Sequence, residues 1–281
     1  MDGIIIINKP VEITSRQVVS KVGKIFNEKK AGHTGTLDPM ASGVLPVLLG
    51  KATKLSKYLV EHDKKYIATL YLGEKRDTGD SEGNIIEKND VPIFDNDIIE
   101  SALKKFVGKI QQIPPMYSAI KVKGKKLYEY ARDGVEIERA PRDIEIYDIK
   151  LLEYYENKIK FEVFCSKGTY IRVLCEDIAE ELGTVGFMQN LERIQVDKFK
   201  IEDSVKLDEL SEDYDNIITI EQYFNYLERI ILNSRKLELF LNGVKLTFEQ
   251  PDGIYNIYNS SNEYIGIGII ENNLLKRDII L

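Results

Sequence analysis

The sequence contains few of the side chains that bind metal ions or form disulfide bonds. Its 281 residues include two cysteines, Cys165 and Cys175, two histidines, His33 and His62, and no tryptophan. The cysteines lie ten residues apart without a CxxC spacing, so the usual ligand spacings of a structural zinc site are missing. We expect both cysteines to be free, buried and chemically inert, and we expect no bound metal.

Long apolar runs are also absent. The N-terminal residues 4–7 are four consecutive isoleucines without a preceding basic stretch, which does not resemble a secretory signal peptide. No run approaches the ~20 apolar residues that a membrane-spanning helix needs. A length of 281 residues, with 43% apolar and 30% charged residues, predicts one large domain and one small one. We expect a cytoplasmic protein without membrane contact.

The formal net charge of −7 argues against a general nucleic-acid binder, since such proteins usually carry a basic surplus. The charge is unevenly distributed. Residues 200–232 hold nine acidic and three basic side chains, whereas residues 114–142 hold seven basic and four acidic ones. The local field at a binding face matters more than the total charge, so RNA binding through residues 114–142 stays open.

Hydrophobic periodicity predicts a chain that mixes strands and helices. From about residue 234 onward, short alternating runs separated by glycine and asparagine predict a small β-barrel. In the larger part, residues 44–49 form a short buried run. We expect strands at residues 4–7, 66–72, 144–155 and 159–164, the last two paired antiparallel, and helices that start at Thr14 or Ser15, run over 54–61, run from Asp95 to about Val107, and run over 169–182.

Residues 31–43, AGHTGTLDPMASG, form a polar loop between a predicted helix and an apolar run. Glycine allows a positive φ or the close approach of another backbone, and an aspartate before proline is disfavoured in a helix. Asp38 has two interpretations. It is either a turn former that hydrogen-bonds its own backbone or an ionised nucleophile or base. Composition and spacing alone leave both open.

The segment GHTGTLDP (residues 32–39), followed by ASGVLP (41–46), resembles the signature of the bacterial tRNA pseudouridine-55 synthases, the TruB family. The resemblance implies that Asp38 is the nucleophile, that Gly32 and Gly35 support its loop, and that His33 helps to hold a flipped-out nucleotide. INKP (7–10) is similar to the N-terminal motif of that family, in which the lysine and proline, here Lys9 and Pro10, buttress the loop.

Three further motifs are similar to those of the family. DKKY (63–66) implies that Tyr66 stacks on the target base and serves as a proton acceptor. KGTYIR (167–172) implies that Arg172 pairs with the catalytic aspartate and that Tyr170 contacts the flipped uracil. NLER (190–193) implies that Leu191 touches the base.

Without the resemblance, these positions have plainer interpretations. Lys9 would be a surface lysine, Tyr66 a half-buried strand residue and Leu191 a core residue. Three departures from the family pattern are evident: Glu12 replaces a glycine, GFM (186–188) replaces a more usual pattern with a histidine, and Glu192 replaces the first of two arginines. They bear on backbone conformation and RNA affinity rather than on chemistry.

QIPPMYSAIK (112–121) looks like the start of the RNA-gripping thumb of the family, here residues 114–142. Its alternative is a solvated hairpin tip. The resemblance implies a catalytic domain over 1–232, with an acidic connecting segment at 200–232, and a reduced PUA-like RNA-binding domain over 233–281. We expect phosphate contacts, which position RNA rather than read its sequence, from Lys121, Lys123, Lys125, Lys126 and Arg132.

Together these features imply an α+β fold with a mixed, largely antiparallel sheet flanked by helices. The implied activity is the isomerisation of uridine 55 in the tRNA T-loop, with base flipping and covalent catalysis by Asp38. Arg172, within ~4–6 Å, would keep Asp38 ionised. Substrate and product are isomers, so no cofactor is required. The partner is the T-arm of tRNA, and a monomer is the default.

Two alternatives compete with this interpretation. The first is a non-catalytic tRNA-binding or folding protein. The second is a glycosidase or nucleoside hydrolase with an aspartate nucleophile, which needs a second carboxylate about 5 Å away, and none is evident in the sequence near these motifs. A guide-RNA-dependent relative is also conceivable, although the short C-terminal module favours a stand-alone enzyme.

Overall fold

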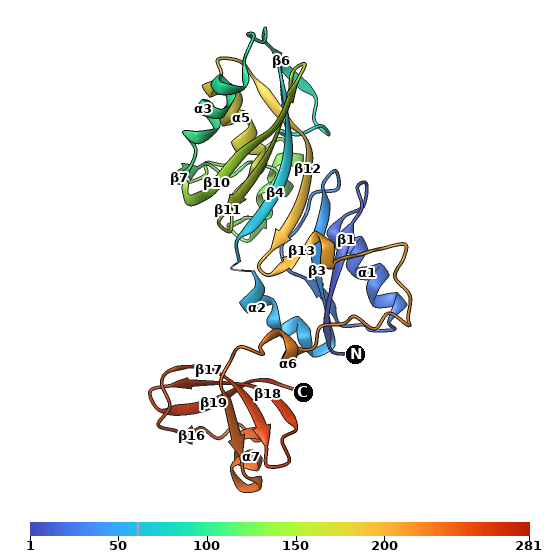
Figure 1. The fold of residues 1–281 in the computed structure, drawn as a ribbon, viewed down its shortest axis with the longest axis vertical. Coiled ribbons are helices and arrows are strands. Elements are labelled where there is room, and N and C mark those ends of the chain that lie inside the picture. Colours follow the sequence, from blue (N-terminus) through green and yellow to red (C-terminus); the bar gives the residue numbers. More distant parts are fainter. Residues whose placement is uncertain (61) are drawn as a thin grey trace.

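The computed structural model describes residues 1–60 and 62–281. Figure 1 shows an elongated molecule in which one long sheet runs through the larger part and a separate, smaller sheet lies at one end. The larger sheet has ten strands and the smaller one five. Both chain segments that we expected to form separate folding units are therefore built on their own sheet.

The ten-stranded sheet is mixed and mostly antiparallel, as predicted. Only the pairs β1–β14 and β3–β12 are parallel. The main path of this sheet, in spatial order, is β14 (Val205–Lys206), β1 (Gly3–Lys9), β3 (Ser42–Leu49), β12 (Gly186–Val196), β4 (Lys64–Leu72), β11 (Lys158–Cys165), β10 (Arg142–Tyr155) and β7 (Gly108–Gln112). The remaining two strands lie off this path: β2 (Ala31–His33) pairs with β3, and β13 (Phe199–Lys200) pairs with β12.

Helix α1 (Ser15–Ile25) begins where the sequence predicts it. The Thr14 side chain accepts a hydrogen bond from Gln17 N, and the Gln17 side chain accepts one from Thr14 N at 2.8 Å, which is a capping box. Val18 and Val22 are buried against β1 and β3. The helix thus covers the end of the sheet that carries the Asp38 loop.

Helices α3 (Asn96–Lys104) and α5 (Ile171–Glu181) cover the other half of the sheet, where they lie side by side (Figure 1). Asp95 caps α3, but the helix ends three residues before the predicted Val107. The amides of residues 105–107 bond to carbonyls three residues back, and Gly108, with φ +110°, turns the chain into β7. Helix α5 starts two residues later than predicted, after its N-cap Tyr170.

The helix predicted over residues 54–61 is a two-part element. A 3₁₀ helix, η1 (Gly50–Leu55), leads directly into one α-helical turn, α2 (Ser56–Leu59). Residue 61, the predicted end, lies outside the described residues. Short 3₁₀ pieces of this kind are common connectors, and hydrophobic periodicity over eight residues cannot distinguish them from a single helix.

The C-terminal sheet curls into a half-barrel consistent with a PUA-like module, and α7 (Ser234–Leu241) packs against it. Its first strand, β15, begins at Arg229 because it pairs in parallel with residues 256–259. Residues 229–232, which precede the expected start of the small domain at residue 233, thus belong to its sheet. The strand order is β15 (Arg229–Leu232), β17 (Gly253–Asn259), β18 (Tyr264–Glu271), β19 (Leu274–Ile280) and β16 (Leu246–Thr247).

The two sheets are joined by direct contacts around α2 and α6 (Ile220–Tyr223). Tyr58 donates a hydrogen bond to Asp278 Oδ2 at 2.6 Å, and its ring packs edge-on against Phe224 with centroids 5.3 Å apart. Lys57 pairs with the same carboxylate of Asp278. The small module is thus packed against the large one rather than tethered by a free linker.

The acidic segment covers the β1 edge of the large sheet. After η2 (Ile201–Asp203), its strand β14 pairs with β1, and Leu210, Tyr214 and Ile217 pack against the apolar cluster beneath α1. Ile218 exchanges two backbone hydrogen bonds with Ile4. Its carboxylates face solvent at Asp208, Glu209, Glu212, Asp213 and Asp215. The segment therefore buries apolar side chains and exposes its charge.

Two small hairpins complete the described chain: β5 (Glu74–Arg76) with β6 (Ile85–Lys88), and β8 (Lys121–Val122) with β9 (Lys125–Lys126), which leads into α4 (Leu127–Arg132). Both cysteines are buried, and burial raises the pKa of the Cys165 thiol to about 12. Across residues 1–60 and 62–281, no helix has the length and apolar character needed to cross a membrane.

Candidate active site

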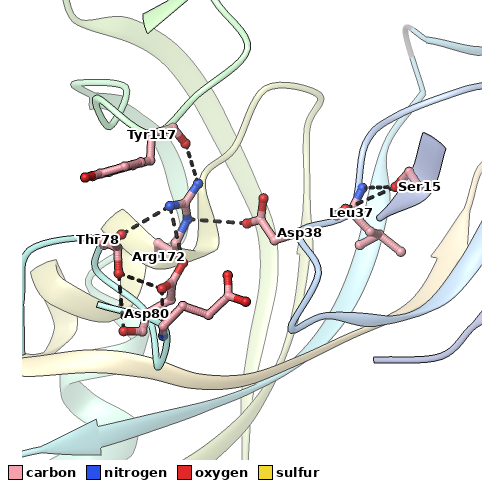
Figure 2. Close-up of polar contacts among 8 residues, drawn as sticks. Ser15, Leu37, Asp38, Thr78, Asp80, Tyr117 and Arg172 are labelled. Carbon is pink, nitrogen blue, oxygen red and sulfur yellow. Dashed lines mark hydrogen bonds and ion pairs between the residues drawn. The ribbon is translucent and has the colours of Figure 1, made fainter. Parts of the chain in front are cut away.

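The Asp38 loop connects β2 to β3 and is held on both sides of the aspartate. Ser15, the first residue of α1, accepts a hydrogen bond from Leu37 N at 2.9 Å and donates one to Leu37 O at 3.0 Å (Figure 2). On the other side, Pro39 O accepts hydrogen bonds from Glu12 N at 2.8 Å and Lys9 Nζ at 3.3 Å. The backbone around Asp38 is thus fixed by strand β1 and helix α1 together.

Lys9 is fully buried, so the plain expectation of a surface lysine is wrong. Its Nζ also donates to Pro10 O at 2.9 Å and Ile13 O at 2.7 Å. Burial lowers the pKa of Lys9 to about 8, against the opposing attraction of Asp38. A buried ammonium group that gathers three carbonyl oxygens ties the end of β1 to the Asp38 loop, which is the position of a buttress.

Arg172, in the first turn of α5, connects three separate segments (Figure 2). Its Nε lies 3.5 Å from Asp38 Oδ2, and its Nη1 lies 3.4 Å from Asp80 Oδ2. It also donates to Thr78 O at 3.1 Å and to Tyr117 O at 2.7 Å. The Arg172 side chain is 8% exposed, whereas that of Asp38 is 38% exposed. The nucleophile candidate therefore has a fixed cation on one side and open space for a substrate.

Asp80 is a site residue that the sequence did not indicate. Residues 76–83 look like an ordinary polar loop, yet Asp80 is buried and accepts hydrogen bonds from Thr78 Oγ1 at 2.6 Å and Glu82 N at 3.1 Å. A second carboxylate thus lies beside Arg172. Glu82 is a third nearby carboxyl, and burial together with the charges of Asp80 and Asp38 raises its pKa.

Tyr66 and Leu191 lie on the neighbouring strands β4 and β12 and pack in the same apolar cluster as Leu37. Tyr66 is 7% exposed. Burial raises its pKa to about 12, while the charge of Arg193 acts in the opposite direction. Asp38 also contributes to the pKa of Tyr66 and that of Tyr170, so the loop aspartate and both tyrosines share one electrostatic environment.

Tyr170, the N-cap of α5, and His33 are two further predicted site residues. Gln112 fixes the backbone of Tyr170, accepting from Tyr170 N at 2.9 Å and donating to Tyr170 O at 3.3 Å. His33 ends β2, and burial followed by the charge of Arg193 lowers its pKa, which keeps the ring neutral near pH 7. Its Nδ1 is buried without a hydrogen-bond partner within residues 1–60 and 62–281.

Arg193 is a second site residue that the sequence did not single out. It is 1% exposed in β12, and it donates to Val44 O at 2.8 Å and Gly35 O at 3.0 Å. Gly43 adopts φ +105°, and a Cβ there would lie 2.2 Å from Arg193 O, so only glycine allows β3 to approach β12 this closely. Gly43, the last glycine of the loop, thus allows the close contact between β3 and β12.

The thumb projects from the same region and carries the predicted basic residues. Lys123 and Gly124 both have positive φ, +51° and +85°, as the tight turn between β8 and β9 requires. Lys121, Lys123 and Arg132 are exposed. Lys125 pairs with Asp133, and Lys126 and Arg132 each lie 5.3 Å from the centroid of the Tyr128 ring. Three of the five cations are thus already engaged within this segment.

The chain matches two family models. Residues 23–171 match the TruB family pseudouridylate synthase N-terminal domain, and residues 172–237 match the tRNA pseudouridylate synthase B C-terminal domain. The chain belongs to the TruB family. Two relatives named tRNA pseudouridine synthase B are similar over most of their length. That of Hydrogenovibrio crunogenus is 43% identical, covering 95% of this chain and 89% of the relative, and that of Clostridium acetobutylicum is 46% identical, covering 95% of each.

Solved structures show the same fold. An H/ACA ribonucleoprotein bound to a substrate RNA containing 2′-deoxyuridine includes a chain with a TM-score of 0.70 and 25% identity, covering 99% of this chain and 85% of that one. A Cbf5–Nop10–Gar1 complex includes one with a TM-score of 0.68 and 28% identity, covering 95% and 78%. The present chain therefore shares its fold with these chains, and its family and the names of its relatives make it an isomerase that acts on tRNA uridine.

Glu12 is a position at which this TruB-family chain departs from the pattern that its motifs resemble. Glu12, where the family usually has glycine, adopts φ +65°. Its N–H still donates to Pro39 O. The left-handed backbone is retained although the residue carries a Cβ, which costs roughly 1–2 kcal/mol for an L-residue. The loop geometry is thus preserved at an energetic cost.

Proposed function

We propose that this chain isomerises uridine 55 in the T-loop of tRNA to pseudouridine. The observation that carries the proposal is the pairing of Arg172 with Asp38 at an open position of the fold. The names of the relatives support tRNA as the substrate. The reaction breaks the glycosidic bond from N1, turns the uracil, and forms a new bond from C5 to the ribose.

Asp38 is the nucleophile in this proposal. The carboxylate is the attacking group, and the Arg172 guanidinium group lies beside it. The carboxylate adds either to ribose C1′ or to uracil C6 and is released when the new glycosidic bond is complete. The clamps on Leu37 and Pro39 hold this carboxylate in place before the substrate arrives, so little reorganisation accompanies the attack.

The target base must leave the folded T-loop to reach Asp38. Tyr66 offers an aromatic face, Leu191 an apolar contact and Tyr170 a further contact to the flipped uracil. The neutral ring of His33 suits stacking in the position that the nucleotide vacates. Lys9, Pro10, Gly32 and Gly35 support the loop.

The RNA grip in this proposal comes from the thumb and the C-terminal module. Exposed lysines at the thumb hairpin contact phosphates, while the acidic face at residues 208–215 lies elsewhere on the surface. RNA loops are recognised by shape and by splayed bases, which suits two separate contact elements. We propose a monomer that acts in the cytoplasm, where tRNA is available, with residues 1–228 as catalytic domain.

The test is tritium release from tRNA labelled at uracil C5. We expect release with the wild type, none with Asp38→Asn, and full release with Asp208→Asn, an exposed carboxylate far along the chain. A tRNA with cytidine at position 55 should release nothing from that site. Bound tRNA without any release would favour a tRNA-binding protein, and free uracil would favour the hydrolase alternative. Either result contradicts the proposal.

A further inference from the structure

Arg193 is a buried cation without a carboxylate partner. Within residues 1–60 and 62–281 it forms no ion pair, and its guanidinium group is held by the carbonyl oxygens of Val44 and Gly35. The positive charge of Arg193 lowers the pKa of Lys9 and of Lys64, which are themselves cations and supply no counter-charge. Burying a charge without a counter-charge is unfavourable, so this arrangement is costly unless a negative charge forms nearby.

Tyr66 lies opposite Arg193 in the sheet. The two residues are direct cross-strand neighbours in the β4–β12 pair, so their side chains lie on the same face of the sheet. The charge of Arg193 lowers the pKa of Tyr66, against the larger effect of burial. Tyr66 is in turn the group that favours the charged form of Arg193.

We propose that Arg193 is a positioning residue for Tyr66, and that its guanidinium group supplies the positive charge that stabilises Tyr66 Oη while this oxygen takes the proton from C5 of the uracil. The inference rests on the function proposed above, since it assigns a partner to the proton acceptor of that reaction. Arg193 touches neither substrate nor the reacting atoms, and it acts through Tyr66.

The step balances as follows. Tyr66 first loses its phenolic proton to solvent, and Arg193 makes this form less unfavourable. After C5 has bonded to the ribose, the C5–H bond breaks and its proton bonds to the phenolate oxygen. The electron pair of that bond forms the C5=C6 double bond, and the C6=N1 π pair moves to N1, which takes a proton from water. Tyr66 then returns the C5 proton to solvent.

A purely structural role is the competing explanation, because Arg193 also holds the loop carbonyls. A lysine keeps the charge but lacks the planar fork that serves several oxygens at once. Neutral glutamine removes the charge. The two substitutions thus separate the charge on Tyr66 from the packing of the loop.

The experiment measures single-turnover pseudouridine formation with tRNA carrying hydrogen or deuterium at C5 of uridine 55. We expect Arg193→Gln to slow the reaction about 10²-fold, as loss of one stabilising donor typically does, and to raise the C5 isotope effect because proton removal becomes the slow step. Lys9→Gln disturbs the same loop without touching Tyr66, so it should slow the reaction without raising the isotope effect. An unchanged isotope effect in Arg193→Gln overturns the inference.

A second measurement distinguishes the loss of charge at position 193 from a folding defect of the variant. In Arg193→Gln, 3-fluorotyrosine at position 66 makes the phenol more acidic and should restore part of the lost rate, whereas a loop defect, as in the charge-retaining Arg193→Lys, would not respond. In the Tyr66→Phe background, Arg193→Gln should cause less than a twofold further loss, and a full additive loss contradicts the inference. If the wild type forms no pseudouridine, the proposed function fails, which differs from an active wild type with no isotope response.

Discussion

Asp80 and Arg172 form a buried ion pair, with Asp80 Oδ2 3.4 Å from Arg172 Nη1. Both side chains are less than 10% exposed. The guanidinium group therefore has a fixed orientation before it meets Asp38, and Asp80 compensates a charge that would otherwise be buried alone. The more exposed Asp38, the proposed nucleophile, thus faces a guanidinium group that Asp80 already holds.

The first prediction concerns this pair. Asp80→Asn keeps the shape but removes the charge, so the Arg172 guanidinium group is less firmly oriented. Hydrogen bonds to charged groups contribute about 1.5–3 kcal/mol, so we expect single-turnover tritium release to slow roughly tenfold to hundredfold. Asp208→Asn, on the solvent-exposed acidic segment, is the matched control and should retain the wild-type rate. Equal rates in both variants would show that Asp80 is dispensable.

The second prediction uses the strained backbone at Glu12, where φ is +65°. Glu12→Gly removes the Cβ from a left-handed position, and we expect the free energy of unfolding to rise by about 1 kcal/mol after the entropy of the more flexible unfolded chain is subtracted. Urea denaturation measures this. Glu12→Ala is the control, because it removes the carboxylate but keeps the strain. If alanine stabilises as much as glycine, the charge rather than the backbone is responsible.

The fold could be predicted from the sequence where signals are local. Helix α1 follows from its apolar spacing and the Thr14 cap, and the β10–β11 hairpin from two alternating runs on either side of a short turn. The 3₁₀ start of the 50–59 element and the β15 strand were missed because neither has a period of its own. Residues 229–232 form the strand β15 because they pair with β17.

The site was predictable only as far as motifs reach. Asp38, Tyr66 and Arg172 lie in segments that resemble family motifs. Asp80 lies outside these motifs, and Arg193 ends the NLER segment without an assigned role. The importance of both arises from long-range contacts, between Asp80 and Arg172, 92 positions apart, and between Arg193 and Gly35, 158 positions apart. In the sequence, Asp80 looks like part of an ordinary polar loop and Arg193 like an ordinary strand residue, because the contacts of each form only in the folded chain. Buried charge of this kind has no local signature.

The third prediction follows from the pKa of Lys9, lowered to about 8 by burial. In the unfolded chain this lysine titrates near 10.4. Between those values the unfolded state binds more protons, so the contribution of Lys9 to stability becomes more favourable as pH rises. We expect the difference in free energy of unfolding between the wild type and Lys9→Met to change by about 1–3 kcal/mol from pH 8 to pH 10. A difference that stays constant over this range would mean that Lys9 titrates normally.

The fourth prediction tests the thumb hairpin. Lys121 in β8 and Lys123 in the turn after it are exposed, whereas Lys125 is already paired with Asp133. A double substitution, Lys121→Gln with Lys123→Gln, removes two phosphate contacts, so tRNA affinity should fall and the slope of log affinity against log salt should decrease in magnitude by about 1–2. The single-turnover rate at saturating enzyme should stay the same, since phosphate contacts position the RNA and leave the chemistry at Asp38 unchanged.

The matched control for the thumb replaces two exposed lysines that pair with acidic neighbours elsewhere, Lys88→Gln and Lys104→Gln. These changes alter the net charge by the same amount, so they separate a local contact from the overall field of the protein. Filter binding at several salt concentrations gives both slopes. If the control pair weakens tRNA binding as much as the thumb pair, the long-range field rather than the hairpin holds the RNA, because screening acts on both pairs alike.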